Sequence, residues 1–250
     1  MQTDIVMGIP VDALTKEDIV KDVPNYLSED KKMTLISVNP QIVTEAAGYP
    51  EVVAFIKQST HRIPDGIGIV LVSKLTGGPI KERVAGYDLM LEMLAYADRH
   101  QKSIFLYGAK PNVLKDTDKH VREMYPNLRI VGMIDGYVTS TDEEIVKQIN
   151  AVSPDFLFVA LGFPRQEQFL AKHFQDLNVH IFQDVGGSFD VLSGHVKRAP
   201  DLFIKWHLEW LYRSVSNPTR IGRMLQLPVF LGKSLYWNYR NKTMRWTNGD

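Results

Sequence analysis

Five short runs of apolar, largely β-branched or aromatic residues recur along the chain, separated by longer segments in which apolar residues have helical spacing. Parallel strands need crossover connections, usually helices, so this alternation predicts a parallel sheet. Strands that are apolar along their whole length indicate burial on both faces. We therefore expect a Rossmann-like α/β fold, with a largely parallel sheet covered by helices on both faces. The expected strands are 33–38, 103–108, 128–133, 155–162 and 180–186, and the expected helical segments are 41–58, 87–100, 111–125 and 140–152.

The segment after Gly194 differs in charge from the rest of the chain. Residues 196–245 hold ten Lys or Arg against two Asp or Glu, a net charge of +8, while the remaining 19 basic and 27 acidic residues give −8. A basic end on an acidic body indicates an anionic partner, such as a substrate phosphate, a membrane surface or a nucleic acid. We expect an α/β catalytic core of residues 1–195 and a helical appendage of residues 196–250.

The appendage interleaves aromatic residues with its cations. No stretch of about 18 uncharged apolar residues occurs in the chain, so we expect no segment to span a bilayer. The mixture favours a helix that lies in the headgroup plane beside anionic lipid. An RNA-binding segment would share this composition, but no recognised nucleic-acid motif accompanies it. We therefore expect a membrane surface as the partner and no nucleic acid.

Signals for secretion and for metal binding are weak. The chain has no cysteine, which suits a reducing cytoplasm, and residues 1–12 do not have the pattern of a signal peptide. The seven histidines have no metal-binding spacing. Asp116 and Asp118 spell a D-x-D that many sugar-nucleotide enzymes use for a divalent cation, but they fall in the middle of a predicted helix. We expect no metal and no other cofactor.

Polar residues gather where the apolar runs stop. Asn39 follows the run 33–38, Asp65 follows a shorter run that ends at Ile63, Gln166 follows 155–162, and Asp190 follows 180–186. Ligands of parallel sheets bind at the carboxyl ends of the strands. These four loops should therefore open onto a single crevice.

Each of these positions has two interpretations. Asp65 can cap the helix that follows it, or it can act as a general base at the floor of the crevice. Asn39 can be a helix cap or a ligand contact, and Gln166 and Glu167 can be ordinary first-turn residues or can line the site. The glycines at 186–187 can make a tight turn, or they can bring backbone N–H groups close to a phosphate.

A phosphate-bearing substrate bound without a metal needs cations from the protein. Arg83 and three arginines of the appendage, Arg213, Arg220 and Arg223, are the candidates. Arg220 and Arg223 are three residues apart, on one face of a helix expected to begin near Pro218. A solvated basic face is the alternative interpretation.

Seven stretches, in order along nearly the whole chain, resemble the WecG/TagA/CpsF family of bacterial glycosyltransferases, and most closely its teichoic-acid branch. They are NPQIV (39–43), IPDGIGIV (63–70), ERVAGYDLM (82–90), IFLYGA (104–109), FVALGFPRQE (158–167), VGGSFDVLSGHVKRAP (185–200) and LEWLYR (208–213). Pro40, between Asn39 and Gln41, departs from the pattern, because other members often have a small residue and Glu there.

The resemblance implies an inverting, metal-independent transfer of N-acetylmannosamine from UDP-N-acetylmannosamine. The acceptor would be the 4-hydroxyl of N-acetylglucosamine on undecaprenyl diphosphate, in the synthesis of the wall teichoic acid linkage unit. The appendage would dock at the inner face of the cell membrane and close over the site, and the chain would self-associate away from the membrane. A sister activity with a UDP-uronate donor (UDP-ManNAcA or UDP-GlcA) stays open, as does a non-catalytic nucleotide- or RNA-binding module.

The resemblance also implies residue roles. Asp65 would be the catalytic base. Ser37, Asn39 and Gln166 would hold the sugars, and Asp190 would read the uracil edge above Gly186 and Gly187. The leaving diphosphate would be neutralised by Arg83, Arg213, Arg220 and Arg223.

Overall fold

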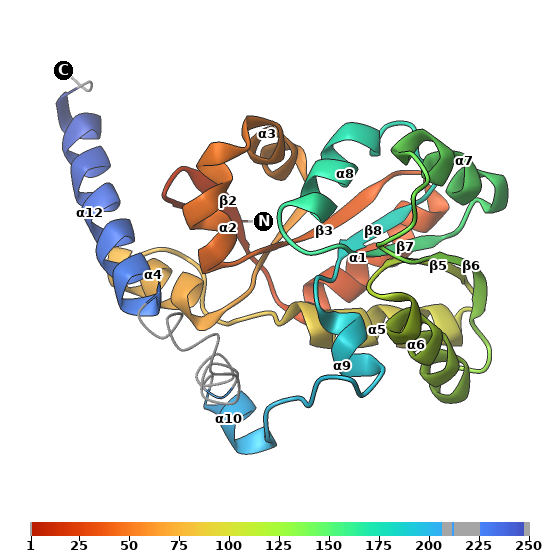
Figure 1. The fold of residues 1–250 in the computed structure, drawn as a ribbon. Helices are drawn as coiled ribbons and strands as arrows, with labels where there is room; N and C mark the ends of the chain where they lie inside the picture. The colour runs from red at the N-terminus through yellow and green to blue at the C-terminus, as the bar shows by residue number, and fades with distance from the viewer. Residues whose placement is uncertain (1, 207–211, 213–225, 248–250) are drawn as a thin grey trace.

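A six-stranded parallel sheet forms the centre of the protein in a computed structural model, which describes residues 2–206, 212 and 226–247 (Figure 1). Its strand order is β4-β3-β8-β7-β5-β6, and each neighbouring pair is parallel. The α/β expectation is therefore confirmed. The strands are β3 (Met33–Val38), β4 (His61–Pro64), β5 (Ser103–Gly108), β6 (Arg129–Ile134), β7 (Phe156–Ala160) and β8 (Ile181–Asp184).

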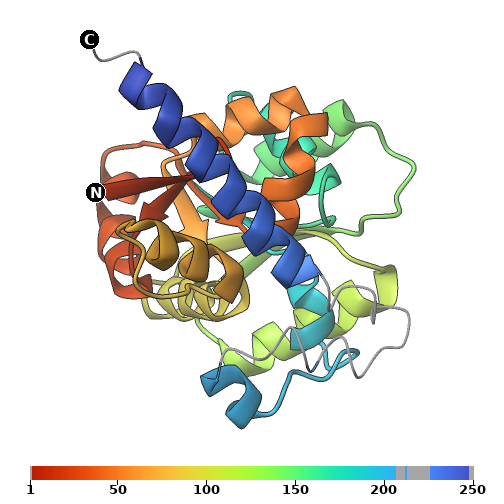
Figure 2. The same cartoon turned by 90° about the vertical axis from the view of Figure 1, so that its left-hand side faces the viewer.

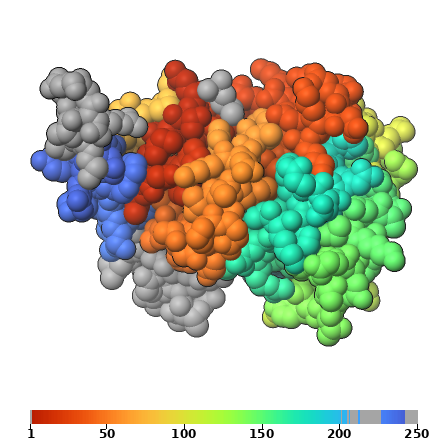
Figure 3. All heavy atoms as spheres, turned by 90° about the horizontal axis from the view of Figure 1, so that it is seen from above, coloured from red at the N-terminus to blue at the C-terminus, as the bar shows by residue number. Residues whose placement is uncertain are grey.

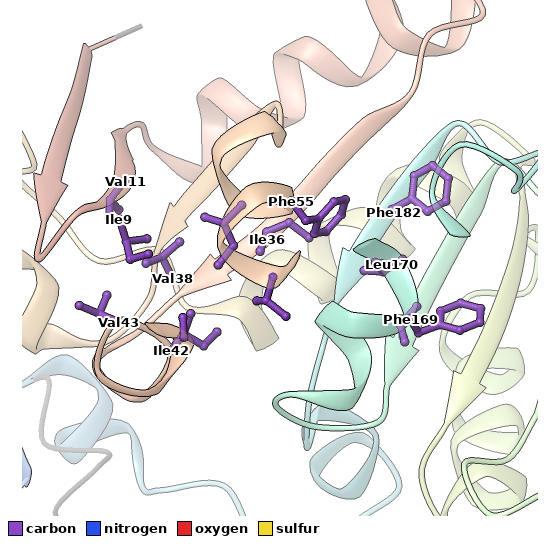
Figure 4. Close-up of a cluster of buried hydrophobic side chains, with 14 of the residues drawn as sticks. Ile9, Val11, Ile36, Val38, Ile42, Val43, Phe55, Phe169, Leu170 and Phe182 are labelled. Carbon is purple, nitrogen blue, oxygen red and sulfur yellow. The ribbon is translucent and has the colours of Figure 1, made fainter. Parts of the chain in front are cut away.

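Helices cover both faces of this sheet. Side chains alternate across each strand, so that in β3 Leu35 faces one apolar cluster while Ile36 faces the other. The cluster of Leu35 includes residues of α1 (Lys16–Ser28), α5 (Gly86–Arg99), α6 (Pro111–Met124) and α9 (Ser188–Leu192). The cluster of Ile36 includes residues of α2 (Pro40–Glu45), α3 (Pro50–Gln58), α4 (Ile67–Thr76), α7 (Asp142–Val152) and α8 (Arg165–His173), and Figure 4 shows part of it. Seen from above, α2 and α3 (orange) lie between the N-terminal residues (red) and α8 (teal) (Figure 3).

The N-terminal hairpin was not predicted. Strands β1 (Gln2–Val6) and β2 (Ile9–Ala13) form a separate antiparallel pair. Met7 and Gly8 both have positive φ, as a two-residue hairpin turn requires, but Met-Gly is not a typical turn dipeptide. The hairpin is fixed to the sheet by Asp12, which is fully buried and accepts hydrogen bonds from Arg62 and Thr3.

The segment 41–58 is not one continuous helix. It divides into α2, a 3-10 turn η1 (Ala46–Gly48), and α3. Pro50 explains the break, because proline has no N–H to continue a helical ladder and is favoured at the first helical position, which it occupies in α3. The strands expected at 155–162 and 180–186 are shorter than predicted, since their last residues belong to the loops that line the cavity described below.

Two helices of the C-terminal region are described, α10 (Asp201–Lys205) and α12 (Gln226–Thr247). Helix α12 packs across α4 and touches α2 (Figures 1 and 2). The predicted helix start at Pro218 and the arginines at 213, 220 and 223 lie outside the described residues, and the division at residue 195 stays a prediction. In the part of the chain with assigned structure, no helix combines the length and the apolar character needed to cross a bilayer.

Candidate active site

A cavity of about 460 Å³ opens at the carboxyl ends of β3, β4, β7 and β8. The convergence of these four loops on one crevice is therefore confirmed. Eight of the residues singled out in the sequence line the cavity: Ser37, Asn39, Asp65, Arg83, Gln166, Glu167, Gly186 and Gly187. The N-terminus of α5 completes the wall with Gly86 and Tyr87, which the sequence analysis did not single out as site residues.

Asp65 stands at the point where β4 ends. Its backbone N–H donates to the carbonyls of Val38 and Ile63, at 3.0 and 2.9 Å. Gly66 follows with φ +88°, a conformation that glycine adopts without strain, and it is the N-cap residue of α4. The side chain of Asp65 makes no capping bond; its Oδ1 instead accepts from Arg83 Nε at 3.2 Å. The capping interpretation of Asp65 is therefore wrong.

Arg83 and Asp65 form an ion pair inside the cavity. The two side chains are only 15% and 24% exposed, so their charges are partly shielded from water. The loop that carries Arg83 is fixed next to β4 by the Val84 N–H, which donates to the Pro64 carbonyl at 3.0 Å. Arg83 thus orients the Asp65 carboxylate through Oδ1 and leaves Oδ2 on the side of Gly86.

Ser37 and Asp65 face a shared space beside Gly86. A Cβ atom at position 86 would lie 3.0 Å from Ser37 Oγ and 3.7 Å from Asp65 Oδ2. Ser37 is held from behind, because its N–H donates to Asp184 Oδ1 at 2.9 Å. The hydroxyl and the carboxylate can therefore approach the same group of a substrate.

Asn39 is both a helix cap and a cavity residue. Its Oδ1 accepts from the N–H of Ile42 at 3.0 Å, and Pro40 takes the first helical position of α2, where proline is favoured. The departure at Pro40 is therefore compatible with the local helix. The capping bond uses the amide oxygen of Asn39 and does not use its two N–H donors.

Gln166 joins two loops of the cavity. Its Oε1 accepts from the N–H groups of Gly162 and Gly186, both at 3.1 Å, and its Nε2 donates to Glu167 Oε1 at 2.9 Å. The β7–α8 and β8–α9 loops are thus tied together by one amide group. Glu167 and Asp184 lie beneath it, almost completely buried. The sequence left open whether Glu167 is an ordinary first-turn residue or lines the site, and it does both; Asp184 was not singled out.

Three acidic candidates from the sequence, Asp190, Asp116 and Asp118, do not line the cavity. Asp190 is in α9 and does not line the cavity, although its Oδ2 is 3.9 Å from where a Cβ of Gly187 would lie. Asp116 is bonded to His195 and Asp118 to Arg122, in the middle of α6 as expected. Across the described ranges, no group of three or more His, Asp or Glu side chains is arranged to hold a metal ion.

Comparison with known proteins gives a consistent result. The sequence model of the glycosyl transferase WecG/TagA/CpsF family matches residues 5–244. A relative from Bacillus spizizenii (strain W23) is 43% identical over 82% of this chain and 80% of its own, and one from Bacillus subtilis (strain 168) is 40% identical over 92% and 90%. A relative from Staphylococcus aureus (strain MW2) is 31% identical over 91% and 90%. All three are named N-acetylglucosaminyldiphosphoundecaprenol N-acetyl-beta-D-mannosaminyltransferase.

Proposed function

The chain belongs to the WecG/TagA/CpsF family of glycosyl transferases, and on that premise we propose that it is an N-acetylglucosaminyldiphosphoundecaprenol N-acetyl-β-D-mannosaminyltransferase. It transfers N-acetylmannosamine from UDP-N-acetylmannosamine to the 4-hydroxyl of lipid-linked N-acetylglucosamine, in wall teichoic acid linkage-unit synthesis. The observation that carries the proposal is the shared name of relatives that align over most of both chains. The cavity at the carboxyl edge of the sheet, with a carboxylate in it, supports the same chemistry.

Asp65 is the general base of this reaction. Its Oδ2, on the side away from the Arg83 contact, takes the proton of the acceptor hydroxyl as that oxygen attacks the anomeric carbon. The bond from the anomeric carbon to the diphosphate breaks, and UDP leaves with the electron pair. One direct displacement inverts the anomeric centre, so an α-linked donor gives a β-linked product.

The leaving diphosphate needs positive partners, because two phosphate groups gain charge as the bond breaks. The turn at Gly186 and Gly187 lies at the cavity wall. The Gly186 N–H donates to Gln166, so Gly187 is the one of these two glycines whose N–H we assign to the diphosphate. Asp190, close to Gly187, is assigned to the uracil edge. Arg213, Arg220 and Arg223 supply the charge that a metal provides in other enzymes. Ser37, Asn39 and Gln166 border the space for the sugars.

The enzyme works at the inner face of the cell membrane as a peripheral protein. The acceptor is attached to a lipid, and the C-terminal segment 196–245 carries a net charge of +8. On α12, Val229, Leu235, Tyr236 and Tyr239 are exposed although they are apolar or aromatic. Aromatic and aliphatic side chains next to cations are typical of helices that lie in the headgroup region.

The activity is tested by incubating the purified protein with UDP-N-acetylmannosamine and a lipid-diphospho-N-acetylglucosamine analogue, and measuring UDP release with and without a chelator. We expect release in both conditions. UDP-uronate donors serve as the comparison, and a preference for one of them would replace the proposed donor.

The role of Asp65 is tested with Asp65→Asn, which keeps the size of the side chain and removes the base. We expect turnover to fall by about 10²- to 10⁴-fold, the usual contribution of a general base, while UDP affinity and the melting temperature change little. A matched control is Asp30→Asn, an exposed carboxylate that precedes β3 and so lies at the edge of the sheet opposite the cavity, beside His180. Wild-type turnover in Asp65→Asn would refute the assignment.

A further inference from the structure

Two carboxyl groups, Glu167 at the start of α8 and Asp184 at the end of β8, belong to residues that line the cavity. Their exposed fractions are 0% and 1%. Each has one oxygen with a defined donor: Asp184 Oδ1 accepts from the Ser37 N–H, and Glu167 Oε1 accepts from Gln166 Nε2. The remaining oxygens, Glu167 Oε2 and Asp184 Oδ2, are buried and have no donor from any described residue. The two carboxyl groups are close enough for each to affect the pKa of the other.

The surroundings of this pair disfavour a double negative charge. Burial raises the pKa of both carboxyl groups, and the charge of Glu167 raises the pKa of Asp184 further. Asp65, from the end of β4, adds repulsion to Asp184, while Arg83 is bonded to Asp65. Among the described residues, the donors that bond to the pair are uncharged, the Ser37 N–H from β3 and the Gln166 amide from α8. Two adjacent buried carboxylates that no described cation contacts cannot both remain ionised.

We propose that Glu167 and Asp184 share a single proton, and that this hydrogen-bonded pair positions the floor of the active site. The proton occupies the space between Glu167 Oε2 and Asp184 Oδ2 and gives both unpartnered oxygens a partner. The positioning role rests on the proposed function, whereas the shared proton can be observed without measuring any activity.

The pair acts on the site through two neighbours. Glu167 accepts from Gln166 Nε2 and thereby fixes which end of that amide faces the loops, so that Oε1 meets the N–H groups of Gly162 and Gly186. Asp184 holds the backbone of Ser37, whose hydroxyl lies beside Asp65. Loss of the proton would make the two carboxylates repel each other. The amide of Gln166 and the end of β3 would then lose their fixed positions.

The test compares Glu167→Gln with Glu167→Ala. The glutamine can accept from Gln166 through its oxygen and donate to Asp184 Oδ2 through its nitrogen, so it replaces the shared proton with a permanent donor. The alanine removes both bonds and leaves Gln166 and Asp184 without their partner. We expect Glu167→Gln to keep kcat within about threefold of wild type, whereas Glu167→Ala should lose on the order of 10- to 100-fold, as misplaced catalytic groups do.

The pH profile gives a second readout. Because the shared proton is held above the ordinary carboxyl pKa, wild-type kcat should decline on the alkaline side as that proton is lost, and the Glu167→Gln profile should lack this decline. A glutamine variant as inactive as the alanine variant, or one with an unchanged alkaline limb, would overturn the positioning role.

A spectroscopic readout is independent of turnover and separates this inference from the proposed function. The infrared C=O band of a protonated carboxyl group should be present in wild type near neutral pH and absent in both Glu167→Gln and Asp184→Asn, because each amide leaves one ionised carboxylate. The band can be measured even if Glu167→Ala does not fold or if the protein transfers another sugar. Absence of such a band in wild type would overturn the shared proton.

Discussion

At the scale of single residues, the space beside Gly86 is as informative as the charged groups around it. Gly86 begins α5 and is buried, and its missing side chain leaves room between Ser37 Oγ and Asp65 Oδ2. Its φ lies outside the left-handed region, so the backbone itself does not require glycine there. The need for glycine therefore comes from the cavity and not from the helix.

This predicts that Gly86→Ala separates stability from activity. Alanine favours a helix over glycine by up to about 1 kcal/mol, so the melting temperature should not fall by much. The new methyl group would meet Ser37 Oγ at 3.0 Å, which is close enough to displace the hydroxyl or narrow the space at Asp65. We expect kcat/KM to fall at least tenfold, measured by UDP release.

Gly48→Ala is the matched control, because a Cβ at position 48 has no neighbour within 4 Å and its φ also lies outside the left-handed region. It should leave the kinetics unchanged. Full activity of Gly86→Ala would mean that the reaction does not use the space between Ser37 and Asp65.

The sequence was sufficient to find Asp65, because a carboxylate between a proline and a glycine at a strand end has few roles. It was not sufficient to find the contact with Arg83, 18 residues further along the chain, because that contact depends on how the loop folds back onto β4. Asp184 offered a signal that was not used. Asp184 falls within the expected buried strand 180–186, which made it a candidate for burial, and a buried carboxylate requires partners.

At the scale of elements, α12 contacts α4 and α2, the two helices that begin next to the cavity. Phe230, only 2% exposed, and Leu227 pack on α4 at Gly68, where a Cβ would lie 2.9 Å from Leu227 Cδ1 and 3.2 Å from Phe230 Cδ1. The same position is 2.9 Å from Pro40 Cγ, at the first residue of α2. Helices α4 and α2 directly follow Asp65-Gly66 and Asn39. The position of α12 can therefore affect the loops that carry these side chains.

We expect Phe230→Ala to loosen α12 and to reduce transfer. Truncating a buried phenylalanine to alanine lowers stability by about 3 kcal/mol. Because Phe230 belongs to α12, we expect this loss mainly in the free energy with which α12 packs on the body. Amide hydrogen exchange should accelerate in α12 and stay slow in the central sheet. Val229→Ala, an exposed neighbour on the same helix, should leave amide exchange unchanged. Equal exchange in the two variants would show that Phe230 does not hold the helix.

The central strands could be predicted from the sequence, whereas the N-terminal hairpin could not. Buried parallel strands are continuous apolar runs, so five of the six were visible in outline and the sixth was marked by its end at Asp65. The hairpin β1–β2 was not predicted. It is held to the sheet by the buried Asp12–Arg62 pair, and an ion pair between residues 50 apart leaves no local sequence pattern. The break between α2 and α3 could have been inferred from Pro50.

At the scale of the whole molecule, the charge is divided between an acidic body and a basic C-terminal segment, although the net charge is zero. An evenly mixed surface would have little preference for anionic lipid, whereas this division gives the protein one end that is attracted and a body that is repelled. This division of charge could be read from the sequence because the net charge of a segment depends only on its composition. Which basic residues face outward depends on how α12 docks.

The docking of α12 leaves Lys233 and Arg240 exposed, while Phe230 and Ser234 are buried. We therefore expect Lys233→Gln/Arg240→Gln to bind anionic vesicles more weakly than wild type. Each basic residue near such a surface contributes about 1 kcal/mol, so the loss of two should lower the partition constant by about 30-fold at low salt. Co-sedimentation with vesicles containing anionic lipid measures it, and neutral vesicles should show no difference.

The control is Lys21→Gln/Lys147→Gln, which removes the same charge from exposed positions on α1 and α7. If the C-terminal helix faces the membrane, the control should bind much like wild type, because charges held more than a Debye length from the lipid are screened. At high salt, the differences in vesicle binding between wild type and the two double variants should disappear. If both double variants lose binding equally, net charge alone governs association, and the orientation with α12 toward the lipid is wrong.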